Sequence, residues 1–146
     1  REEVDRSALI KGLKDGTIDA CTSSHEPFSE HMKQIEFDLA PPGVIGLETA
    51  LLALIEAFNT KDPYPKVTEK MSTKPHQILG LEPPSLKEGE IADLVVINPS
   101  GNWTYDPSLG LSRSQNSPFG GYKFKNQTIL TASGGNIAWN SAEDSL

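Results

Sequence analysis

The sequence LETALLALIEAF, residues 47–58, carries the clearest structural pattern in the chain. Its apolar side chains recur at intervals of three and four residues, which is the spacing of one face of an α-helix. The residues in this pattern are Leu47, Ala50, Leu51, Leu54, Ile55 and Phe58. The pattern predicts a helix that ends near Asn59, before the helix-breaking pair Asp62-Pro63. Other elements must cover the apolar face of this helix.

The segments before this helix predict half of an α/β unit. Residues 3–14 place apolar side chains near one helical face, and Gly16 follows as a C-terminal stop. Residues 18–22 are a short apolar run that predicts a buried strand. A helix, a glycine turn and a strand in this order are typical of α/β folds. The polar residues 29–38 have no clear period and are long for a connection, so they form a candidate functional loop.

The segments after the long helix change character at Pro83-Pro84. Before this pair, we expect a weaker helix over residues 66–72 and a short one from Pro75 to Gly80. After it, the sequence predicts strands and turns. We therefore divide the chain into a helical and α/β part, residues 1–84, and a β part, residues 85–146.

The β part contains four β-prone runs. They are residues 92–98, 103–105, 128–133 and 136–140. Gly134-Gly135 separates the last two runs and predicts a hairpin. Trp103, Tyr105 and Trp139 fall in these runs, and we interpret them as core residues of the β part rather than as an aromatic binding platform.

Composition limits the class of protein. The chain has 146 residues, a formal net charge of −7 and 36% hydrophobic residues, which suits one domain with or without a small appendage. The acidic balance argues against nucleic acid as a partner, and no apolar run reaches the ~20 residues of a membrane helix. The first residues lack a signal-peptide pattern, so we expect a cytoplasmic protein. The absence of an initial Met favours a piece of a longer chain.

Five motifs occur in a fixed order along the chain. They are REEVDR with GTID (residues 1–6 and 16–19), APPGVIGLETAL (40–51), STKP with ILGL (72–75 and 78–81), Gly89 with ADLVV (92–96), and NSPF (116–119). In this order and spacing they resemble the C-terminal third of dihydroorotases and their relatives in the amidohydrolase superfamily. The resemblance covers nearly the whole chain.

The resemblance implies an α/β fold made of two parts. Residues 1–84 would supply the last strand and the last helices of an amidohydrolase (β/α)8 barrel, and residues 85–146 a segment of a small, composite C-terminal β-sandwich. The first seven barrel strands would lie outside this chain. In active relatives, zinc ions held at the ends of barrel strands activate a water molecule that attacks a cyclic amide. No cofactor is expected to bind to this chain alone.

The stretch TSSHEPF, residues 22–28, aligns with the family pattern Thr-Asp-His-Ala-Pro-His on the last barrel strand. The resemblance assigns the Asp to metal contact and general base catalysis, and the last His to substrate binding. Ser24 stands at the Asp position and Phe28 at the His position. Serine is a poor base near neutral pH, and phenylalanine cannot hydrogen-bond a carboxylate. The chain therefore resembles a catalytically impaired homologue.

Four further residues belong to the candidate site. Glu26 lies two positions after Ser24 and would share its side of an extended chain, so it is a weak candidate for a substitute base or else a solvated loop residue. We expect His25 to have a packing or supporting role rather than a metal-binding one. Pro42 and Gly43 match a loop whose backbone contacts the substrate in active relatives. A plain turn before the long helix explains them equally well in a full-length ancestor, and better in this chain, because the rest of the pocket is absent.

The remaining reactive side chains are interpreted as structural. Cys21 lies in an apolar run and is expected to be a buried small side chain rather than a catalytic thiol. His31 and His76 are expected to be isolated surface residues. Arg1 matches an arginine near the active-site loop of the family, but the residues that would accompany it precede this sequence.

Two functions follow from the resemblance. The first is a non-catalytic, dihydroorotase-like protein of pyrimidine biosynthesis with a structural role, and the implied partner is aspartate carbamoyltransferase. The alternative is a fragment of an active cyclic amidohydrolase of the dihydroorotase, allantoinase or hydantoinase type. In both cases the open strand at residues 18–22 and the helix at residues 47–58 predict pairing with the remaining barrel portion or with a second copy of the chain.

Overall fold

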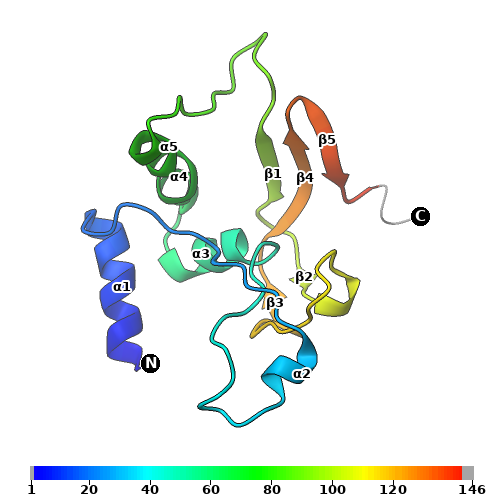
Figure 1. The fold of residues 1–146 in the computed structure, drawn as a ribbon. Helices are drawn as coiled ribbons and strands as arrows, with labels where there is room; N and C mark the ends of the chain where they lie inside the picture. The colour runs from blue at the N-terminus through cyan, green and yellow to red at the C-terminus, as the bar shows by residue number, and fades with distance from the viewer. Residues whose placement is uncertain (1, 143–146) are drawn as a thin grey trace.

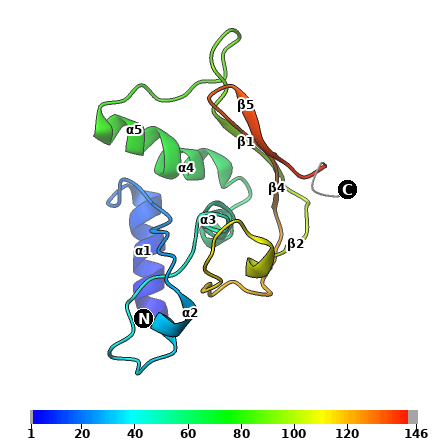
Figure 2. The same ribbon diagram turned by 45° about the vertical axis from the view of Figure 1, so that its right-hand side comes forward.

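The computed structural model describes residues 2–142 and contains helices followed by strands. The helices are α1 (Glu3–Asp15), α2 (Glu30–Lys33), α3 (Ala50–Phe58), α4 (Tyr64–Thr68) and α5 (Lys74–Leu79), with a π-helical turn (Glu69–Thr73) between the last two and a short 3-10 helix (Pro107–Leu109). The strands are β1 (Leu94–Asn98), β2 (Trp103–Thr104), β3 (Lys123–Phe124), β4 (Gln127–Ser133) and β5 (Asn136–Asn140). Figures 1 and 2 show the three-stranded sheet beside the helices, joined to α5 by a long connection.

Helix α3 is the centre of the core. It contacts α1, α4 and β3, and its buried side chains are Leu52, Leu54, Ile55 and Phe58. Contact on several sides explains why more than one stripe of this helix is apolar. The predicted start at Leu47 is wrong, because the helix begins at Ala50 and the Leu47 side chain is 67% exposed.

The predicted short helix from Pro75 to Gly80 is confirmed as α5, which has Pro75 in its first turn and Gly80 as its C-cap, but the predicted break before it is wrong. Helix α4, the π-helical turn and α5 form one continuous helical segment from Tyr64 to Leu79. Proline lacks an amide proton and its ring collides with the carbonyl four residues earlier in a regular α-helix. The π-helical turn directly before Pro75, in which the Lys74 amide donates to the Glu69 carbonyl, widens the backbone at this point.

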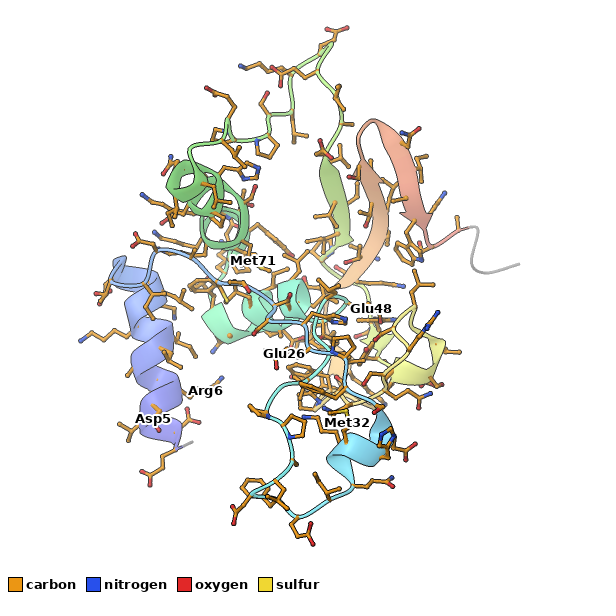
Figure 3. The ribbon with its side chains drawn as sticks, viewed as in Figure 1. Asp5, Arg6, Glu26, Met32, Glu48 and Met71 are labelled. Carbon is orange, nitrogen blue, oxygen red and sulfur yellow. The ribbon has the colours of Figure 1, made fainter. Side chains whose placement is uncertain are left out.

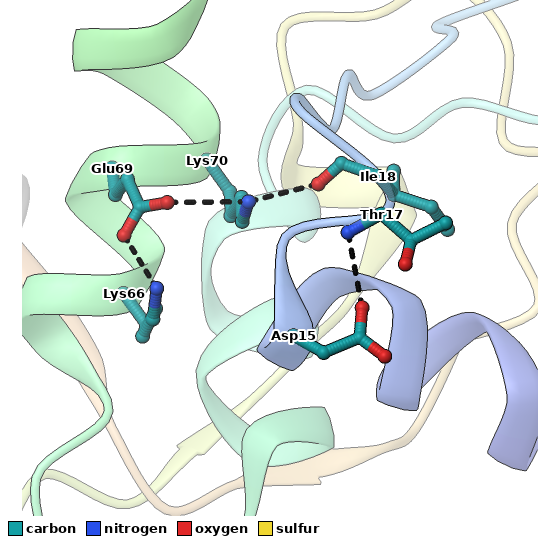
Figure 4. Close-up of polar contacts among 6 residues, drawn as sticks. All are labelled: Asp15, Thr17, Ile18, Lys66, Glu69 and Lys70. Carbon is teal, nitrogen blue, oxygen red and sulfur yellow. Dashed lines mark hydrogen bonds and ion pairs between the residues drawn. The ribbon is translucent and has the colours of Figure 1, made fainter.

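Residues 18–22 are extended but form no strand, because the described residues offer them no partner strand. A buried lysine holds them instead. The Lys70 side chain is 1% exposed, and its Nζ atom donates to the Ile18 carbonyl over 2.8 Å and lies 3.2 Å from a Glu69 carboxylate oxygen (Figure 4). The Cys21 amide in turn donates to the Lys70 carbonyl over 2.9 Å. Hydrogen bonds from Lys66 and Lys70 lower the pKa of the Glu69 carboxyl.

The β part forms two small antiparallel sheets. Strands β1, β4 and β5 form one, with β4 in the middle, and β2 pairs with β3 in the other. The predicted hairpin is confirmed: β4 and β5 are joined at Gly134 and Gly135, whose positive φ angles of 57° and 79° fit a tight turn.

The aromatic residues do not form one cluster in the β part. Tyr105 and Phe124 are buried in the same core as α3, and Trp103 packs against both. Trp139 lies on β5 in the other sheet. The two parts of the chain therefore share one hydrophobic core.

Among residues 2–142, no helix combines the length and the apolar character needed to cross a membrane. Arg1, which the family resemblance singled out, lies outside the described residues.

We expect Lys70→Met to lower the free energy of unfolding by about 1–3 kcal/mol, because the Ile18 carbonyl loses a charge-assisted partner in a partly buried place. Urea denaturation measures this change. The matched control is Lys66→Met, which removes an exposed lysine bonded to the same Glu69 carboxylate and should have little effect. Equal effects of the two variants would contradict a special role for Lys70.

Candidate functional site

Two segments that are distant in sequence meet at the candidate site. His25 and Val44 form an isolated parallel bridge, and the Glu26 amide donates to the Val44 carbonyl over 2.9 Å. The His25 Nδ1 atom accepts from the amides of Gly46 at 3.1 Å and Leu47 at 3.4 Å. The structure thus brings the residues that follow Ser24 beside the Pro42–Gly43 turn.

The geometry of His25 gives it a structural role. Because Nδ1 accepts two amide protons, the neutral ring carries its own proton on Nε2. In this tautomer neither ring nitrogen has a free lone pair for a metal ion. His25 therefore fixes the start of the segment that leads into α3.

Ser24 lies on a turn at the end of the extended segment. Its side chain is exposed, and its amide donates to the Thr22 hydroxyl over 3.1 Å. Its φ angle is 45°, in the left-handed region that Asp and Asn adopt more readily than most other non-glycine residues. The backbone at this position would accommodate an aspartate, but the serine hydroxyl supplies no carboxylate.

Glu26 lies directly against Gly43. A Cβ atom placed on Gly43 would come within 2.1 Å of a Glu26 carboxylate oxygen and 2.8 Å of the Glu26 Cβ. Gly43 also has a φ angle of 112°, so both conformation and space require glycine there. Within residues 2–142 the Glu26 carboxylate has no hydrogen-bond or ion-pair partner. Figure 3 shows Glu26 on the segment before α2 and Glu48 on the segment before α3.

Sequence reasoning missed Lys33 and Asn116 as parts of this site. The Gly43 carbonyl accepts from Lys33 Nζ at 2.7 Å and from the Asn116 amide group at 3.0 Å. Lys33 Nζ also donates to the Pro41 carbonyl over 2.5 Å and lies 4.9 Å from the centre of the Phe28 ring. Lys33 lies in a polar loop with no helical or strand periodicity, so the sequence did not predict that its side chain contacts the turn. Asn116 lies in the NSPF motif, which did give a signal, although not one for this contact.

Glu48 connects the other side of the site to the β part. Its carboxylate accepts from the Leu111 amide at 3.2 Å and lies 2.8 Å from the place where a Cβ atom on Gly110 would be. Two effects raise the pKa of the Tyr105 hydroxyl: the larger is burial, and the second is the negative charge of Glu48. The backbone of the chain after β2 is thus attached to the segment before α3.

The other candidate residues stay apart from the site. His31 is exposed on α2, and the Nδ1 atom of His76 lies 2.8 Å from the Ser72 carbonyl oxygen, within its own helical segment. Cys21 is partly buried against the core, and burial raises the pKa of its thiol.

The residues at the end of the extended segment do not fit the metal ion that the family pattern expects there. The Ser24 hydroxyl is a weak ligand for a divalent cation, and the His25 ring is engaged by backbone amides. Across the part of the chain that the structure describes, no three His, Cys, Asp or Glu side chains are grouped to hold a metal ion.

Solved structures define the fold class. The dihydropyrimidinase from Brevibacillus agri NCHU1002 matches with a TM-score of 0.85 and 22% identity, over 97% of this chain and 32% of its own. A D-hydantoinase (dihydropyrimidinase) from Thermus sp. matches with a TM-score of 0.80 and 22% identity, over 92% of this chain and 31% of its own. The chain thus has the fold of part of a hydantoinase-type amidohydrolase.

Sequence comparison narrows the family. The dihydroorotase of Endomicrobium trichonymphae is 40% identical over 142 residues, 95% of this chain and 34% of its own length. That of Desulforapulum autotrophicum is 41% identical over 140 residues, 95% of this chain and 33% of its own. No family model matches the chain. The chain is thus a homologue of dihydroorotases over nearly its whole length, and it spans about a third of the length of the curated relatives it matches.

Exchanging glycine and alanine at an ordinary position changes the free energy of unfolding by roughly 0.5–1 kcal/mol. We expect Gly43→Ala to lower the free energy of unfolding by more than this, because the new methyl group collides with Glu26. Gly89→Ala is the matched control, since Gly89 also has a positive φ angle, 89°, but nothing lies within 4 Å of the added Cβ. Thermal unfolding of both variants separates the collision from the backbone strain. Similar melting temperatures would contradict the contact between Glu26 and Gly43.

Proposed function

We propose that this chain is the C-terminal portion of a dihydroorotase-like protein that has lost catalysis and retains a structural role in an assembly. The observation that carries the proposal is the serine at position 24. It occupies the turn where the family pattern places the catalytic carboxylate, in a backbone conformation suited to aspartate.

The surroundings of Ser24 support this proposal. The backbone contacts that build the site are present, from the His25–Val44 bridge to the Gly43 carbonyl held by two side chains. The two side chains that the family pattern assigns to chemistry are Ser24 and Phe28, which carry neither a base nor a carboxylate-binding group. A scaffold kept without its reactive groups fits a role in assembly better than a role in hydrolysis.

Exposed apolar side chains support a role in association. Phe37 is 92% exposed and Leu111 is 99% exposed, and many other large apolar residues are also accessible. Monomeric soluble proteins rarely leave this much apolar surface uncovered. We propose that the partner is the remaining barrel portion, which would correspond to the two-thirds of the curated relatives' length that this chain does not cover, or a second copy of the chain. We further propose aspartate carbamoyltransferase as a partner of the assembled protein.

The alternative function is hydrolysis of a cyclic amide by an active enzyme of which this chain is a fragment. Glu26 favours it, because its carboxylate is exposed, lies two residues from Ser24 and has no partner within the described chain. In this alternative Glu26 would take the place of the missing base.

We expect the intact protein that contains this chain to bind no catalytic metal and to leave dihydroorotate unhydrolysed. Metal analysis and a hydrolysis assay on one sample measure both. The double variant Ser24→Asp with Phe28→His should restore neither, and its unfolding curve shows whether it still folds. Turnover by the unchanged protein would overturn the proposal, and loss of that turnover in Glu26→Gln would establish the alternative.

We expect the isolated 146-residue chain to associate with itself when the rest of the barrel is absent. Size-exclusion chromatography with light scattering over a dilution series measures the mass. Association should persist at high salt, because apolar contacts are not screened as charge contacts are. A stable monomer at all dilutions would contradict the prediction.

A further inference from the structure

Residues 29–40, here called the strap, lie against the site with almost no burial of their own. They contain the short helix α2, and every side chain among them is exposed except the partly buried Lys33 and Ala40. The apolar side chains of the strap do not hold it, because Phe37 is 92% exposed and Leu39 is 69% exposed. Among residues 2–142, apolar burial, the usual reason for a segment to be ordered, therefore contributes little to the strap.

One side chain connects the strap to the rest of the site. Lys33 is the last residue of α2, and its Nζ atom donates to the carbonyls of Pro41 and Gly43, at 2.5 Å and 2.7 Å. The same ammonium lies over the Phe28 ring, 4.9 Å from its centre. Within residues 2–142, the other side-chain hydrogen bonds of the strap join residues within it, Gln34 with Glu30 and Ser29 with His31.

We infer that Lys33 is a positioning residue that latches the strap and the Pro41–Gly43 turn together beside Ser24 and Glu26. An ammonium group has three donors and attracts an aromatic face, so two carbonyls and the Phe28 ring satisfy it. No carboxylate within the described residues lies at ion-pair distance from Lys33. The Lys33 ammonium therefore interacts with backbone carbonyls of the turn and forms no ion pair within the described residues.

The latch determines which groups of the turn remain available. The Gly43 carbonyl already accepts from Lys33 and Asn116, and the Pro41 carbonyl accepts from Lys33. With Glu26 packed on the other side of Gly43, the chain's own side chains occupy the turn. The two bonds to the Gly43 carbonyl use both of its lone pairs, so a ligand that accepts no substitute for this carbonyl would first have to displace Lys33 or Asn116. This inference rests on the proposed function only in treating the turn as part of the site.

Hydrogen exchange of the complete protein tests the latch with the variant Lys33→Met, which keeps the length of the side chain and removes the donors. We expect exchange at the amides of Met32, Gln34, Leu39 and Ala40, all hydrogen-bonded within the strap, to become about tenfold faster or more. The amides of β4 and β5 serve as an internal reference and should not change. Lys61→Met, at an exposed lysine, is the matched control and should exchange as the unchanged protein does.

A conservative variant completes the test. Lys33→Arg should return most of the protection, because a guanidinium group can donate to two carbonyls and stack on the Phe28 ring. Unchanged exchange in the strap of Lys33→Met would overturn the inference. Equal acceleration in β4 and β5 would also overturn it, because the lysine would then support the whole fold. This readout is independent of hydrolytic activity, so the latch and the proposed function can fail separately.

Discussion

The buried contact between Lys70 and Ile18 is the constraint on which the site depends. The segment that leads from α1 to Ser24 has no partner strand within the described residues, and the Lys70 ammonium and the Cys21 amide attach it to the helical segment from Tyr64 to Leu79. A lysine is almost never fully buried unless its charge is paired. Here the carbonyl of Ile18 and the carboxylate of Glu69 supply that pairing, which sets the direction in which the chain enters the site.

The site itself is built mainly from backbone contacts. His25 accepts backbone amides and Lys33 and Asn116 donate to backbone carbonyls, so side chains hold one main-chain turn against another. Such an arrangement tolerates changes at positions that make none of these contacts. Ser24 is such a position, because its exposed side chain has no role in holding the turn. A serine at the position where the family pattern places a carboxylate is therefore compatible with an intact scaffold.

The sequence predicted best those elements whose cause is local. Gly16 ends α1 with a φ angle of 89°, and Gly134-Gly135 makes the hairpin turn. Prediction from the sequence failed for features that long-range contacts determine. The exposure of Leu47, the continuity of the helix through Pro75 and the missing strand at residues 18–22 all depend on what lies beside the segment in space. Lys33 was missed for the same reason, since its partners are carbonyl groups that every residue has.

The order of strands in the larger sheet has a consequence for how the chain folds. β4 and β5 are joined by a two-residue turn, so they can form on the microsecond timescale typical of hairpins. β1 pairs with β4, and the segment of chain between them contains β2 and β3. The entropy cost of closing this long loop opposes the pairing. Docking of β3 on α3 shortens the effective loop before β1 arrives. We therefore expect the helical core to condense first and β1 to be the last strand to join its sheet.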